Sequence, residues 1–87
     1  MLELKYSGDK TAPEYQQFKA IGWEMVRLER DSLLSVVDKQ IESAIDSGAD
    51  VTLLRQYRQA LRDIPQTFTN PEDVVWPQKP SLPQASA

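Results

Sequence analysis

The chain has 87 residues, which allows one domain at most, and it carries a net charge of -3 with neither cysteine nor histidine. Without these two residue types, disulfides and thiolate metal sites are excluded, and the commonest general base near neutral pH is missing. The negative charge provides no basic field for nucleic acid or an anionic membrane, and no apolar run approaches the roughly 20 residues of a membrane helix.

The first expected element is an extended lead over residues 1–11, whose alternating charged and apolar residues are not typical of a signal peptide. Gly8-Asp9 within it indicates a turn. Thr11 and Glu14 have the spacing of a capping box, and Pro13 is tolerated in a first helical turn. A helix is therefore predicted to begin near residue 12.

Apolar residues then follow helical spacing as far as residue 47. The first stripe consists of Tyr15, Phe18, Ile21, Met25 and Leu28. A second, rotated set consists of Leu33, Val37, Ile41, Ala44 and Ile45. The rotation fits either one long helix or a helix broken near Gly22 or Asp31-Ser32. We favour one helix over residues 12–47, because no proline interrupts it and a single glycine costs only about 1 kcal/mol.

A second helix is predicted over residues 50–64, after Gly48 closes the first in a left-handed conformation and Asp50 caps the new one. Its apolar stripe consists of Val51, Leu54, Tyr57, Leu61 and Ile64. The short link predicts an antiparallel helical hairpin over residues 12–65, in which Leu33, Val37, Ile41 and Ala44 face Leu54, Tyr57 and Leu61. Pro65 is expected to end the second helix.

Residues 66–87 form the last expected element, an extended proline-rich C-terminal segment without helical period. The predicted fold class is therefore all-α, a long and a shorter helix followed by this segment. Two interpretations of Trp76 stay open. Val75 and Trp76 fold back and complete the core of the hairpin, or they dock on a partner.

The charged and nucleophilic residues of the sequence are better explained as ordinary surface residues than as catalytic or binding sites. Arg55, Arg58 and Arg62 occupy adjacent helical turns, which we interpret as a solvated face rather than a nucleic-acid site. A second set of charges, Asp38, Glu42 and Asp46, is interpreted as a solvated acidic face. No serine has a histidine to activate it, and the glycines are isolated. The sequence therefore predicts no catalytic, cofactor or metal site.

Three segments in order resemble the bacteriophage tail assembly chaperone family, which includes the C-terminal part of tail fibre assembly proteins. They are "RLERDSLLSVVD" (residues 27–38), "YRQALRDIPQ" (residues 57–66) and "NPEDVVWPQKP" (residues 70–80). The sequence departs from the family pattern where Lys39 follows Asp38 and where Leu53-Leu54 precede the second segment, since tryptophans are common there. The resemblance implies no catalysis and a partner that is a tail or tail-fibre subunit.

The predicted function is a non-enzymatic chaperone that aids folding, assembly or attachment of that subunit, acting in the host cytoplasm during phage assembly. The alternatives are a structural subunit kept in the virion tail and, from another class, a small nucleic-acid-binding regulator. We expect neither nucleic acid nor membrane as partner, while a second copy of the chain is a further candidate. The predicted partner-binding residues are Phe18, Ile21, Met25, Leu28, Tyr57, Arg58, Val75, Trp76 and Pro77.

Overall fold

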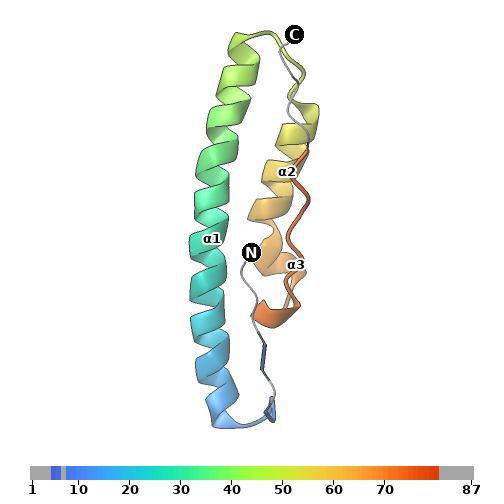
Figure 1. Cartoon of the computed structure of the whole chain (residues 1–87). Coiled ribbons are helices and arrows are strands. Elements are labelled where there is room, and N and C mark those ends of the chain that lie inside the picture. Colours follow the sequence, from blue (N-terminus) through green and yellow to red (C-terminus); the bar gives the residue numbers. More distant parts are fainter. Residues whose placement is uncertain (1–4, 7, 81–87) are drawn as a thin grey trace.

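The computed structural model describes residues 5–6 and 8–80, and helices dominate this part of the chain. The elements in order are α1 (Pro13–Asp46), α2 (Thr52–Arg62), α3 (Ile64–Thr67) and the 3-10 helix η1 (Pro71–Asp73). The described residues contain no strand, which confirms the predicted all-α class. Figure 1 shows α2 lying beside α1, with the chain after η1 passing along α2.

Helix α1 is continuous over 34 residues, as predicted, and Gly22 is buried within it. Its start differs from the prediction, because the N-cap is Ala12 and the capping box of Thr11 and Glu14 does not form. The Thr11 hydroxyl and amide both donate to the Asp9 carboxylate, at 2.7 and 2.9 Å. The Thr11 hydroxyl is therefore used in a local turn with Asp9 and does not cap α1.

The C-terminus of α1 is closed by Gly48, as predicted from the sequence. Gly48 has a φ of 75°. Its amide donates to the Ile45 carbonyl at 3.0 Å, and the Ala49 amide donates to the Ala44 carbonyl at 2.8 Å. These two bonds form a Schellman motif, which satisfies carbonyls that the ending helix leaves without partners.

Substitution of Gly48 by alanine is expected to lower the free energy of unfolding by about 1 kcal/mol. Among the described residues, nothing lies within 4 Å of a Cβ added at this position, so the loss comes from the left-handed backbone and not from a clash. Urea unfolding followed by circular dichroism measures it. Gly48→Asn is the control and should lose less, because asparagine tolerates the left-handed region. Equal losses for the two variants would contradict this explanation.

The second helical region also differs from the prediction at both ends. Asp50 is not the N-cap; its carboxylate accepts bonds from the Thr52 amide and hydroxyl, at 2.9 and 2.7 Å, and Val51 is the N-cap. The predicted end at residue 64 is wrong, since α2 ends at Arg62 and Pro65 lies in the first turn of α3. Proline is compatible with a first turn, where its missing N–H has no partner to lose.

The segment after residue 66 is not wholly extended, which corrects the prediction for this region. Helix α3 continues to Thr67, and Pro71 begins η1. Proline thus starts short helical turns here, because its fixed φ suits the first position of a helix. Residues 74–80, which we call the strap, have no helical or strand structure.

The core forms where α1 meets α2 and α3. Its buried residues are Val26, Val37, Ile41, Ala44, Val51, Leu54, Tyr57, Leu61 and Ile64. The predicted packing of the second stripe of α1 against α2 is confirmed for Val37, Ile41 and Ala44, with Leu33 partly buried beside them. The last residue of that stripe, Ile45, is 52% exposed and does not belong to the core. Trp23, Val74 and Trp76 also pack against this core, so the strap adds to the apolar contacts that the two helices make.

Candidate partner-binding surface

Four of the large exposed apolar side chains of α1 lie on one face of the helix, while Ile45, at 52%, lies on another face near its C-terminus. Ile21, Met25 and Leu28 are 62%, 39% and 66% exposed. Val36, at 47%, lies on the same face two turns further on. We call these four residues the outer stripe. Its first three members were predicted to bind a partner. Val36 was missed, although its spacing of eight from Leu28 is a detectable helical signal.

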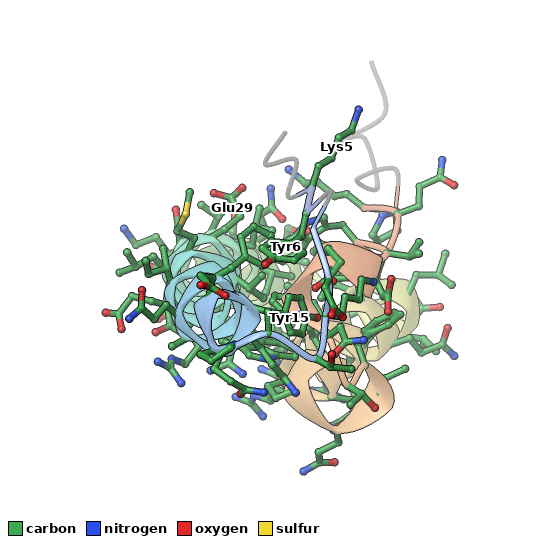
Figure 2. The ribbon with its side chains drawn as sticks, turned by 90° about the horizontal axis from the view of Figure 1, so that it is seen from below. Lys5, Tyr6, Tyr15 and Glu29 are labelled. Carbon is green, nitrogen blue, oxygen red and sulfur yellow. The ribbon has the colours of Figure 1, made fainter. Side chains whose placement is uncertain are left out.

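The start of the predicted first stripe has a different environment. Tyr15 is 4% exposed, and Phe18 is half-buried. Tyr6 packs on both, with ring centroids 4.9 Å from each, and the Tyr15 and Phe18 rings are 5.9 Å apart. Figure 2 shows Tyr6 and Tyr15 on the same side of α1, between the helix and the remainder of the chain. Phe18 therefore joins an intramolecular aromatic cluster, while Ile21, Met25 and Leu28 do not.

Two candidate residues from α2 are held within the fold. Tyr57 is 7% exposed and belongs to the core, where burial and the nearby Glu29 carboxylate raise the pKa of its hydroxyl. Arg58 is half-buried and pairs with Asp38 of α1, with 3.3 Å between Nη1 and Oδ1. These positions link α2 to α1, and the structure does not bring them together with the outer stripe.

The strap places its three candidate residues in two environments. Val75 is 72% exposed, whereas Trp76 and Pro77 are half-buried. Val74 and Trp76 pack against the core on either side of Val75. Alternate side chains of an extended segment point in opposite directions, so Val74 and Trp76 cover the helices while Val75 between them is presented to solvent.

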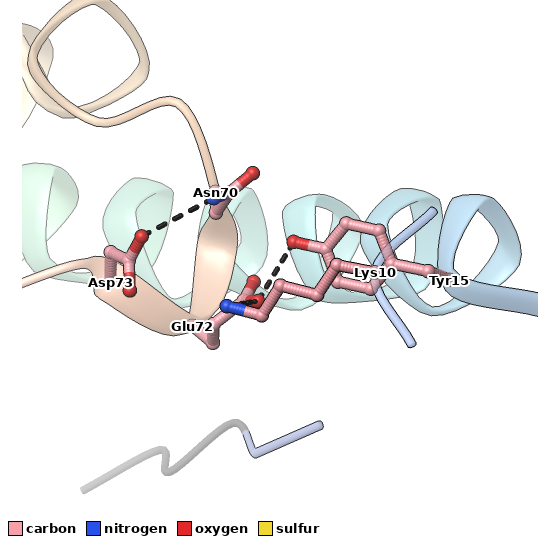
Figure 3. A network of polar contacts seen from close by, with 5 residues as sticks. All are labelled: Lys10, Tyr15, Asn70, Glu72 and Asp73. Atoms are coloured by element: carbon pink, nitrogen blue, oxygen red, sulfur yellow. Dashed lines mark hydrogen bonds and ion pairs between the residues drawn. The ribbon is translucent and has the colours of Figure 1, made fainter. Parts of the chain in front are cut away.

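A polar network that the sequence did not indicate fastens η1 to the beginning of α1. The Tyr15 hydroxyl donates to Glu72 Oε2 at 2.7 Å, and Lys10 Nζ lies 3.0 Å from the same oxygen. Figure 3 shows these side chains converging on Glu72, next to the bond from Asn70 to Asp73. The Glu72 side chain is 8% exposed. Its Oε1 is buried without a hydrogen-bond partner among the described atoms.

The network changes the acid–base properties of both main partners. Burial and the Glu72 carboxylate raise the pKa of Tyr15 to about 12. Burial alone would raise the pKa of Glu72, but the bonds from Tyr15, its own backbone amide and Lys10 outweigh burial and lower it. The arrangement therefore favours an ionised Glu72 beside a neutral Tyr15 at neutral pH.

Acidification is expected to weaken this attachment. A carboxyl group whose pKa is lower in the folded chain contributes stability above its unfolded pKa and loses that contribution as the pH falls through the folded value. Glu72→Gln should therefore destabilise the chain at pH 7, and the difference from wild type should shrink well below pH ~4. Urea unfolding at several pH values measures it. The exposed Glu42→Gln is the control. A difference for Glu72→Gln that does not depend on pH would contradict the linkage.

Comparison with known families gives the chain its context. The family described as phage tail assembly chaperone protein matches residues 23–81, more than half of the chain. The chain belongs to this family. The predicted resemblance is thereby confirmed. No curated protein and no solved structure matched the chain.

The region that matches the phage tail assembly chaperone family includes α2, the strap and three members of the outer stripe, from Met25 to Val36. It begins after the aromatic cluster of Tyr6, Tyr15 and Phe18. Within the described part of the chain, no group of three carboxylates could hold a metal ion, and no helix is long and apolar enough to cross a membrane.

Proposed function

We propose that this member of the tail assembly chaperone family binds a tail or tail-fibre subunit and aids its folding, assembly or attachment without catalysis. The observation that carries the proposal is the outer stripe, which leaves four large apolar side chains exposed on one helix of a family member. Apolar patches of this kind mark interaction sites. The proposed site of action is the host cytoplasm while particles assemble.

In this proposal α1 and α2 act as an antiparallel hairpin, and the strap completes it. The shared core and the pair between Arg58 and Asp38 support a fixed arrangement of the two helices. Residues 12–65 would then form the rigid support, and the surface presented to the subunit would include the outer stripe and Val75 of the strap. A rigid support presents its side chains without an ordering cost at the moment of binding.

Co-expression with candidate tail and tail-fibre subunits tests the proposal. The subunit is expected to be soluble and correctly assembled in the presence of the chain, and to be recovered with it in a pull-down. An unrelated small helical protein expressed at the same level is the control. Equal yields of assembled subunit with and without the chain, for every tail and fibre subunit of the phage, would overturn the proposal.

A further inference from the structure

We infer that the outer stripe is a docking seam for an amphipathic helix of the client whose flanking residues are basic. The inference rests on the proposed function and adds the chemistry of the partner. Ile21, Met25 and Leu28 follow one another at intervals of four and three residues, and Val36 lies two turns beyond. The seam spans about 22 Å along α1, enough for about four turns of a partner helix.

The helical form of the partner follows from the backbone of α1. All 34 residues from Pro13 to Asp46 are helical, so the amides and carbonyls along the stripe are already bonded within the helix. An extended peptide binds by adding main-chain bonds to a free edge, and this surface offers none. A helix instead packs its side-chain ridges into the spaces between apolar residues at intervals of three and four.

The charge of the partner follows from the carboxylates that border the seam. By helical spacing, five exposed acidic residues lie beside it or continue its line: Glu14, Glu24, Asp31, Glu42 and Asp46. Lys39 is the basic residue on this face of α1. Glu24 pairs with Arg27 one turn further on, and Asp31 pairs with the preceding Arg30, each at 3.4 Å. Both carboxylates are mostly exposed, and ion pairs of exposed carboxylates contribute little. The face as a whole is apolar along its centre and acidic around it.

This charge pattern argues against a second copy of the chain as the occupant. In a parallel pair each carboxylate would lie near its own equivalent. In an antiparallel pair the end with Glu42 and Asp46 would lie near the end with Glu14. In the antiparallel pair Lys39 would also lie near Glu14, but in both arrangements the carboxylates outnumber this one lysine, and the excess of like charges disfavours association. A helix with lysine or arginine beside its apolar positions places opposite charges across the interface instead.

Binding of two designed helical peptides to the full chain tests the inference. Both carry leucines at intervals of three and four over about 20 residues; one has lysine and arginine beside them and the other has glutamate. Fluorescence anisotropy of the labelled peptides gives the dissociation constants. We expect the basic peptide to bind at least about tenfold more tightly than the acidic one, and added salt to reduce the difference.

Matched variants locate the binding site. Leu28→Asp should weaken binding of the basic peptide by about tenfold or more. The control is Leu53→Asp, because Leu53 is 62% exposed on α2 and lies away from the seam, so the affinity should stay within about twofold of wild type. Glu24→Lys combined with Asp31→Lys should reduce or reverse the preference for the basic peptide. Circular dichroism confirms that each variant keeps its helix content.

Several results would overturn the inference: no binding of either peptide, equal binding of both, or equal effects of Leu28→Asp and Leu53→Asp. A dimer seen by native mass spectrometry and abolished by Leu28→Asp would assign the seam to a second copy. Failure of this inference can be distinguished from failure of the proposed function. If Leu28→Asp still recovers and assembles the client subunit, the inference fails and the function stands. If wild type does not support any client, the function fails whatever the peptides do.

Discussion

Leu61→Ala is expected to lower the free energy of unfolding by about 2–5 kcal/mol, the range for removal of a buried leucine side chain. Leu61 is 0% exposed and lies in the core that α1, α2 and α3 share. Alanine would leave a cavity that two helices and a strap can fill only in part. Folded domains have about 5–15 kcal/mol of stability in total, so the loss is a large fraction of what a chain of this size has. Urea unfolding followed by circular dichroism measures it.

Leu53→Ala is the matched control for this prediction. Leu53 is on the same helix and has the same chemistry, but it is 62% exposed. Its loss of stability should stay within about 0.5 kcal/mol, as for most surface substitutions. Similar losses for Leu61→Ala and Leu53→Ala would mean that α2 presents a different face to α1 from the one described here.

Trp76→Ala is expected to lower the stability of the isolated chain by about 1–3 kcal/mol. Removal of a fully buried tryptophan costs about 3–5 kcal/mol, and Trp76 is half-buried against the core. In a chain of this size, where 1 kcal/mol shifts the Tm by about 4–8 °C, the loss corresponds to a fall in Tm of about 4–24 °C. Thermal unfolding followed by circular dichroism measures it.

Val75→Ala is the control. The Val75 side chain, next to Trp76, is 72% exposed, so its truncation should change the Tm little. An unchanged Tm in Trp76→Ala would contradict a core role for Trp76 and would favour the second interpretation, in which this residue docks on a partner. A large fall would show that the strap is part of the folded core. Val75 would then be the large apolar residue of the strap that is exposed to a client.

The features that the sequence predicted correctly are those that depend on neighbouring residues. The continuity of α1 follows from the absence of proline, and its end follows from Gly48. The contacts of Ile41 with the α2 region follow from apolar spacing and a short link. The helix starts were harder, because Thr11 and Asp50 each had a competing local bond that spacing does not reveal.

The features that escaped prediction depend on residues far apart in the chain. Tyr15 and Glu72 are separated by 57 positions, and no sequence pattern relates them. No sequence pattern relates Phe18 to Tyr6 either. The place of Phe18 in the first stripe indicated an exposed surface, but in the structure the Tyr6 ring packs on it. The outer stripe itself was predictable in part, because Ile21, Met25 and Leu28 lack partners of matching spacing in the second helix.

The length of α1 has a consequence for the behaviour of the chain in solution. The molecule measures 54 × 17 × 17 Å, with a radius of gyration of 16.3 Å, whereas a compact domain of 87 residues would have about 12 Å. A rod of these proportions has more friction with water than a sphere of equal mass. The monomer will therefore sediment more slowly and leave a gel-filtration column earlier than its 9.9 kDa suggests, as a globular protein of larger mass would.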